Sequence, residues 1–214
     1  MRRCHRKGST RHCSRRVSCV SISFAMRHKY ETRGIVLSRS PSGEANAFVT
    51  LLTPTLGLVR ARAQSVRRSG AKLSAALVTF AESDLVLVRG REGWRVTGAV
   101  LAENWFTKME QVTPRRRAVR VSGLLVRLVA GEAHDSELYP IIKGFFEALV
   151  TLPEDVHESA EMLAALRALA VLGLDAGEIQ GELSEFAPVL LASVEVDRTN
   201  YVARINRGIA ASGL

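Results

Sequence analysis

The chain has 214 residues, of which 47% are hydrophobic and 24% are charged, and its formal net charge is +9. This length allows one large domain or two small ones, each with its own core, and the composition is that of an ordinary folded, soluble protein. No run of about 18 apolar residues occurs, so a transmembrane helix is not expected.

Residues 1–25 carry much of the positive charge. They hold seven Lys or Arg and no acid, which leaves 23 basic against 21 acidic residues in the rest of the chain. Their Arg- and Ser-rich composition resembles a transit peptide, and Met26 follows them as a natural start. A secretory signal fits less well because the apolar part is short and interrupted by serines. We therefore expect residues 1–25 to be a start-site extension with no folded role.

All three cysteines lie in this segment, at Cys4, Cys13 and Cys19. A metal site made of Cys4, His5, His12 and Cys13 is disfavoured, because no CxxC spacing is present and the surroundings are cationic. The remaining chain has no cysteine and can form neither a disulfide nor a cysteine zinc site. A reducing cytoplasm is the simplest environment for it.

Residues 30–105 show short apolar or alternating runs separated by turn residues, the pattern of β-strands. The segment GAKLSAALVTF, residues 70–80, lies between the third and fourth run, where a five-stranded OB barrel carries a helix or a long loop. We predict such a barrel, although another small β-barrel or a sandwich fits the same pattern. The predicted strands are 31–38, 47–53, 58–66, 83–90 and 93–101, the last two forming a hairpin.

After Pro114 the apolar period changes to that of amphipathic helices, whose stripes are first of all core. The fold class is therefore α+β, with a barrel domain at 26–110 and an all-α domain at 111–214, whose formal charges are +6 and −4. The stripes are Val121, Leu124, Leu125, Leu128 and Val129; Ile142, Phe145, Phe146, Leu149 and Val150; Met162, Leu163, Leu166, Leu169 and Ala170; and a last helix with Val202, Ile205 and Ile209 inward.

The predicted third strand, LVRARAQSV, has arginine at alternate positions. Side chains alternate between the two faces of a strand, so Val59, Ala61 and Ala63 face the interior while Arg60 and Arg62 point outward. A cationic surface without acids attracts phosphate and releases counterions when it binds. The predicted DNA-binding residues are Arg60, Arg62, Arg67, Arg68 and Lys72.

The alternative is a solvated basic strand whose partners lie elsewhere in the fold. Aromatic residues on the strands are scarce, and several of them must be core. Binding is therefore expected to be electrostatic, salt-sensitive and poorly sequence-selective. These aromatic residues are Phe48, Phe80, Trp94 and Tyr30.

Catalytic patterns are absent: no phosphate loop or dinucleotide fingerprint occurs. Outside the first segment, no histidine has a carboxylate at a spacing that indicates a catalytic pair, so the histidines are expected at the surface. We expect no enzyme, no cofactor and no metal. The histidines are His28, His134 and His157, and the three glutamates at helical spacing, expected as a solvated acidic face, are Glu178, Glu182 and Glu185.

Three stretches of the sequence, taken in order, carry a family resemblance. They are TRGIVLSRSPSGEANAFVTLLTPTLGLVRARAQSVRRSGAKLSAAL, LLVRLVAGEAHDSELYPII and the terminal INRGIAASGL. In this succession the chain resembles the bacterial RecO family of recombination mediators over nearly all of residues 28–214. Residues 1–25 have no counterpart in the family, in line with a start at Met26.

The resemblance implies an OB domain that binds single- and double-stranded DNA and anneals complementary strands. It also implies work with RecR in loading RecA onto DNA coated by single-stranded DNA-binding protein, in the cytoplasm and associated with the nucleoid. The helical domain is expected to grip the acidic, Asp/Phe-ending tail of the coating protein. Arg127 stands at the position most like the family's tail-contacting arginine. Arg120 lies seven residues before it, on the same predicted helix.

Two departures from the family stand out. Many relatives carry a four-cysteine zinc site, whereas the corresponding LGLDAGEIQGELSEF has no cysteine, so we predict a zinc-free member. Ser65 stands where the family usually has glycine. The rival functions are a generic OB protein that coats nucleic acid, including RNA; a partner-recruiting scaffold; and, as the weakest, an enzyme without a recognisable site.

Overall fold

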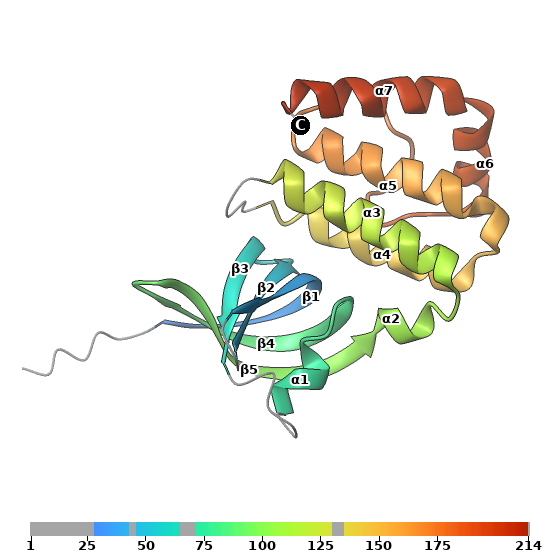
Figure 1. Ribbon diagram of the computed structural model, residues 1–214. Coiled ribbons are helices and arrows are strands. Elements are labelled where there is room, and N and C mark those ends of the chain that lie inside the picture. The colour runs from blue at the N-terminus through green and yellow to red at the C-terminus, as the bar shows by residue number, and fades with distance from the viewer. Residues whose placement is uncertain (1–27, 43–45, 65–71, 130–134, 214) are drawn as a thin grey trace, which may run out of the picture.

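The computed structural model describes residues 28–42, 46–64, 72–129 and 135–213. Five strands close into a barrel in the order β1-β2-β3-β5-β4, and helices stack beside it (Figure 1). The predicted fold class, a five-stranded OB barrel followed by helices, is thereby confirmed. The barrel elements are β1 (Lys29–Ser42), β2 (Asn46–Thr53), β3 (Gly57–Ala63), α1 (Lys72–Ala76), β4 (Ala81–Gly90) and β5 (Gly93–Asn104).

The alternation in β3 is as predicted. Val59, Ala61 and Ala63 are buried, Arg60 is exposed and Arg62 is half-buried. Small alanines suit this position because β3 closes the barrel against β5, where the strands run parallel over three residue pairs. Every other neighbouring pair of strands is antiparallel.

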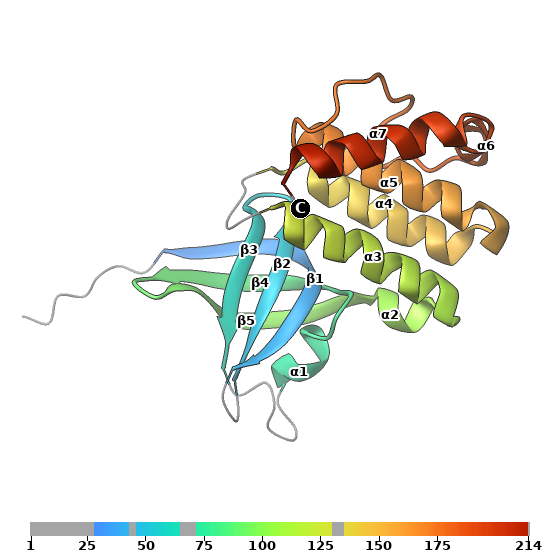
Figure 2. The same cartoon turned by 45° about the horizontal axis from the view of Figure 1, so that its top comes forward.

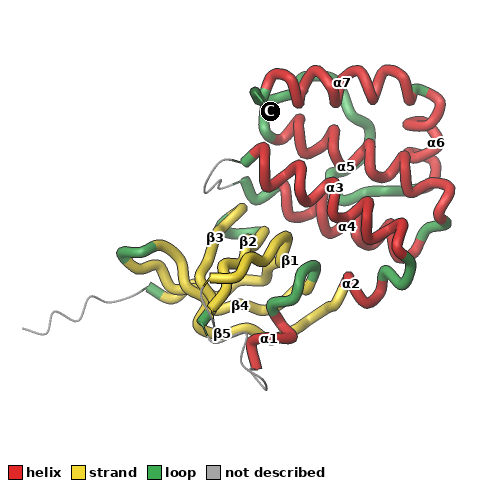
Figure 3. The backbone as a smooth tube through the Cα atoms, in the orientation of Figure 1, coloured by secondary structure: helices red, strands yellow, loops and turns green. Residues whose placement is uncertain are grey.

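The helices form a layer against one end of the barrel, as Figures 2 and 3 show. Helix α5 is its centre, contacting α3, α4, α6 and α7, and Gly173 ends it with a left-handed φ of 71°. The elements are α2 (Trp105–Lys108), α3 (Val112–Leu128), α4 (Leu138–Thr151), the 3₁₀ turn η1 (Glu154–Val156), α5 (His157–Val171), α6 (Pro188–Val196) and α7 (Arg198–Ala211).

The last predicted helix is in fact two helices, and the prediction of which residues face inward was partly wrong. Tyr201, Arg204 and Gly208 are buried on α7, whereas Val202 is 39% exposed. The reason is the buried Arg204, which turns its own face of α7 toward the protein. His157, expected at the surface, is also buried, with Nε2 2.9 Å from the carbonyl oxygen of Leu152.

Two buried arginines hold residues 172–187, which are not helical despite the spacing of their glutamates. Arg167 donates to the carbonyl oxygens of Gln180, Leu183 and Glu185. Arg204 donates to the Asp175 carboxylate and to the Glu178 carbonyl. The segment also lies against α4, where a side chain at Gly144 would overlap the carbonyl of Ser184. The backbone of this segment is thus organised by guanidinium groups.

A buried carboxylate joins the barrel to the helices. Glu82 of β4 accepts hydrogen bonds from Trp105 Nε1 at 3.2 Å and Tyr139 Oη at 2.7 Å, and Lys143 Nζ lies 4.0 Å away. Burial, and then the hydrogen bond to Glu82, raise the pKa of Tyr139. Trp105 belongs to α2, and Tyr139 and Lys143 belong to α4, so this one carboxylate of β4 joins two helices to the barrel.

Candidate nucleic-acid interface

Two kinds of surface share the outer face of β1, β2 and β3. Next to the β2–β3 turn the face is apolar and packs into the helical core. Farther along the same strands it becomes polar and cationic, because Phe48, Thr50, Arg60 and Arg62 take the outward positions. A register shift in β1 between Val36 and Ser38 accompanies the change. The apolar outward residues are Ile35, Leu37, Leu52 and Leu58.

The register brings the outward residues into rows across the sheet. Arg62 is paired with Phe48 of β2 on one side and with Arg95 of β5 on the other. Arg60 is paired with Thr50, and its guanidinium lies 4.8 Å from the centre of the Phe48 ring. Neighbouring strands lie about 4.8 Å apart, so these three arginines form one cationic patch.

Arg62 has an acidic neighbour that the sequence did not indicate. Its guanidinium lies 3.9 Å from the carboxylate of Glu92, at the tip of the β4–β5 hairpin. Glu92 is 84% exposed, so solvent screens this pair and it contributes little. The patch keeps its positive character.

Three of the predicted DNA-binding residues are not placed as fully as the other two. Arg67 and Arg68 lie outside the described residues, as does Ser65. Lys72 is the first residue of α1, and the direction of its side chain is not described. Arg60 and Arg62 are brought together, and Arg95 is an addition. Alternation around Trp94 places Arg95 outward, but only the parallel pairing of β3 and β5 places it beside Arg62.

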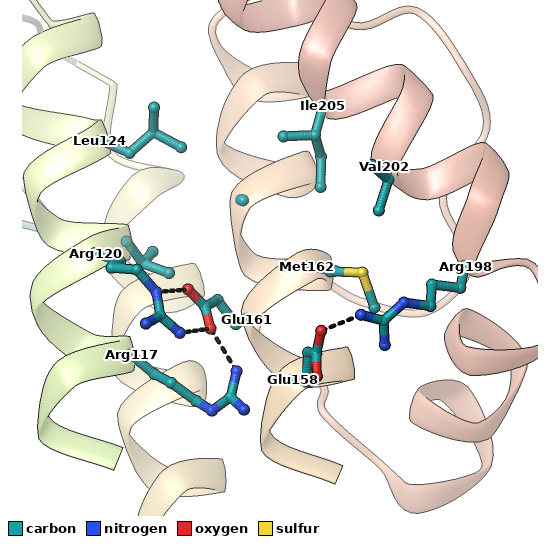
Figure 4. Close-up of a pocket in the computed structure, with 11 residues that line it drawn as sticks. Arg117, Arg120, Leu124, Glu158, Glu161, Met162, Arg198, Val202 and Ile205 are labelled. Carbon is teal, nitrogen blue, oxygen red and sulfur yellow. Dashed lines mark hydrogen bonds and ion pairs between the residues drawn. The ribbon is translucent and has the colours of Figure 1, made fainter. Parts of the chain in front are cut away.

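A second candidate site is a cavity of about 330 Å³ between α3, α5 and α7. Figure 4 shows two groups of ion pairs toward one end and apolar side chains toward the other. Glu161 accepts from Arg117 at 2.7 Å and from Arg120 at 2.5 and 2.6 Å, and Arg198 pairs with Glu158. The apolar lining residues are Val121, Leu124, Met162, Ala165, Val202 and Ile205.

The structure separates the two arginines predicted to bind an acidic tail. Arg120 lines the cavity, and its hydrogen bonds with Glu161 raise its pKa. Arg127 lies in the last turn of α3, exposed, and does not line this cavity. Arg117 and Arg198 were missed. The period of α3 places Arg117 on the same stripe as Arg120, whereas the packing of α7 against α5 is needed to bring in Arg198.

Two features are absent from the described part of the chain. It contains no group of three or more His, Cys, Asp or Glu side chains placed to hold a metal ion. It also contains no helix long and apolar enough to cross a membrane.

Comparison with known proteins gives one consistent result. The family described as "Recombination protein O N terminal" matches residues 26–105. A "DNA repair protein RecO" of Thermobifida fusca is 34% identical over 149 residues, which are 67% of this chain and 60% of the relative. One of Dehalococcoides mccartyi (strain 195) is 30% identical over 122 residues, 57% of this chain and 48% of the relative. The chain spans about half the length of several of the curated relatives it matches.

Proposed function

Since this chain belongs to the RecO family, we propose that it is a DNA repair and recombination mediator without catalytic activity of its own. In this proposal residues 26–110 bind single- and double-stranded DNA and promote annealing of complementary strands. Residues 111–214 receive the acidic tail of single-stranded DNA-binding protein. Together with RecR, the protein helps to load RecA onto the coated strand.

The observation that carries the DNA-binding part is the cationic patch made by Arg60, Arg62 and Arg95. Arg60 and Arg62 lie on β3 and Arg95 lies on β5. Strands β2 and β3 form the face that OB barrels use for oligonucleotides, and the β4–β5 hairpin lies beside it. Its cations project from strands held rigidly in a closed barrel. Such a surface follows a phosphate backbone without reading base sequence.

The salt dependence of DNA binding tests this assignment. In the double variant Arg60→Gln and Arg62→Gln, we expect the slope of log K against log salt to become less steep. The change should be about 1.4 on single strands and about 1.8 on duplex, because each lost phosphate contact removes about 0.7 and about 0.9. Fluorescence anisotropy with labelled oligonucleotides measures both slopes.

The matched control removes two exposed arginines from the helical layer, Arg116→Gln and Arg207→Gln. It has the same loss of charge, so a long-range effect of net charge would appear in both variants. An unchanged slope in the Arg60 and Arg62 variant, or an equal change in the control, would contradict the assignment.

The tail-binding part rests on the cavity between α3, α5 and α7. An apolar lining accepts an aromatic side chain, and the rim carries three arginines against two glutamates, one net positive charge. This combination complements an acidic peptide that ends in an apolar residue. The rim glutamates already occupy the arginines, so a bound tail must compete with Glu161 for Arg117 and Arg120.

A further inference from the structure

Phe48 is an aromatic residue on the outward face of the barrel, within the cationic patch. Two other strand or turn aromatics are in the core, where Phe80 is 1% and Trp94 is 4% exposed. Tyr30 is exposed, but its ring packs edge-on against Trp94, at a centroid distance of 5.1 Å. Phe48 is instead partly exposed on the same face as Arg60 and Arg62.

The ring of Phe48 is flanked by groups suited to a nucleotide. Ser40 is its register partner on β1 and Arg62 is its partner on β3. The Arg60 guanidinium lies over the ring, 4.8 Å from its centre, and so covers an apolar surface that would otherwise face water. A guanidinium in this position can leave the ring when a better partner arrives.

We propose that Phe48 is a stacking platform for an unpaired base and makes this surface prefer single-stranded over double-stranded DNA. The inference rests on the proposed DNA-binding function and adds its strand selectivity. In the free protein Arg60 covers the ring. When a single strand binds, a base replaces the guanidinium, and Arg60 turns to a backbone phosphate beside those held by Arg62 and Arg95.

We expect this exchange to lower the free energy of the complex with a single strand. Stacking of a base on an aromatic ring is worth more than a cation–π contact at an exposed site, and the displaced arginine gains a charge-assisted contact with phosphate. A duplex offers no such base, because its bases are stacked and paired inside the helix and extruding one is costly. The arginines therefore serve both forms of DNA, while the ring serves the single strand alone.

The change Phe48→Leu in the full chain separates the two roles, because leucine keeps an apolar side chain on the strand but removes the ring. We expect affinity for an oligo-dT strand to fall about tenfold, equivalent to about 1.4 kcal/mol, while affinity for a duplex of equal length changes less than twofold. The salt slope should stay that of the unchanged protein, because no phosphate contact is lost.

Phe106→Leu is the matched control. Phe106 is 44% exposed on α2 and carries the same kind of contact, with the Arg115 guanidinium 4.3 Å from the ring centre. It lies outside the cationic patch, so both affinities should be unchanged. Phe48→Trp is the restoring variant: it should keep single-strand affinity, and its emission should be quenched by oligo-dT, since Trp94 and Trp105 are buried.

Equal losses on single strand and duplex in Phe48→Leu, or no loss on either, would overturn the inference. So would an introduced indole whose emission ignores the single strand. These outcomes differ from a failure of the proposed function. In that case the unchanged protein binds neither form of DNA with a salt-dependent affinity, and the Arg60 and Arg62 variant behaves like its control.

Discussion

Arginine side chains occupy three different environments in this chain, and the environment decides what each can do. Arg60 faces solvent beside an aromatic ring and is available to an anionic ligand. Arg120 is 57% exposed but already paired with Glu161, so a ligand must compete for it. Arg167 and Arg204 are 1% and 8% exposed, and they bind the protein's own carbonyl and carboxylate oxygens.

The pair of Asp175 and Arg204 should make stability depend on acid pH. Hydrogen bonding with Arg204 lowers the pKa of Asp175 in the folded state. A lowered folded pKa stabilises the protein above the unfolded value of about 3.9, and this contribution is lost as pH falls below it. Asp175→Asn should reduce the free energy of unfolding by about 3 kcal/mol at neutral pH, and by progressively less in acid. Urea denaturation at several pH values measures the difference.

Asp197→Asn is the control for that experiment, because Asp197 is exposed and accepts from the Asn200 amide at 2.9 Å. Its cost should be below about 0.5 kcal/mol at every pH. If Asp175→Asn lowered the free energy of unfolding by the same amount at every pH, the ion pair would not be the cause of the loss of stability in acid.

At the scale of elements, one contact links β4 to α4 through a single oxygen atom. Glu82 Oε1 accepts from Tyr139 Oη at 2.7 Å in a buried setting. Removing one partner of a buried hydrogen bond leaves the other unsatisfied, so Tyr139→Phe should lower the free energy of unfolding by about 2 kcal/mol at neutral pH. The exposed Tyr30 on β1 provides the control, Tyr30→Phe, with a small expected change.

The same substitution has a signature in alkali. Burial and the bond to Glu82 raise the folded pKa of Tyr139 above the unfolded value of about 10. A raised folded pKa contributes stability below the unfolded value, and that contribution is lost as pH rises through the folded pKa. The difference in free energy of unfolding between the unchanged protein and Tyr139→Phe should therefore shrink above about pH 10. A constant difference up to pH 11 would contradict the role given to this hydroxyl.

Elements differed in how far local patterns predict them. The strands and the helices around Val121, Phe145 and Leu166 follow from period alone, because their apolar residues recur at strand or helix spacing and are buried in the two cores. Residues 172–187 do not, because Arg167 and Arg204 hold their backbone from elsewhere in the chain. The spacing of Glu178, Glu182 and Glu185 is helical by coincidence, and all three are exposed in a non-helical segment.

At the scale of the whole molecule, the cationic patch and the α3–α5–α7 cavity lie on different parts, the barrel and the helical layer. The proposed action on coated DNA needs both surfaces at once. We expect the protein to anneal complementary strands precoated with the cognate single-stranded DNA-binding protein, and to lose most of this activity when the coat protein lacks its acidic tail. A fluorescence annealing assay with both coat proteins measures the difference.

Two single variants locate the tail contact in the same assay. Arg120→Gln should reduce annealing of coated strands about tenfold while leaving annealing of bare strands unchanged, because Arg120 lines the cavity. Arg127→Gln tests the other predicted position, seven residues along α3, and should have a much smaller effect. Annealing of bare strands alone, with no dependence on the tail, would support the generic OB protein instead.

The sequence by itself determined the strand alternation, the helical stripes and the outward direction of Arg60 and Arg62, because these depend on periods of 2 and 3.6 within one segment. Only the tertiary structure decided which outward residues become neighbours. Arg95 joins the patch and Arg198 joins the cavity because β3 closes against β5 and α7 packs on α5. These contacts join segments distant in sequence, and their geometry depends on barrel closure and core packing, which no local pattern records.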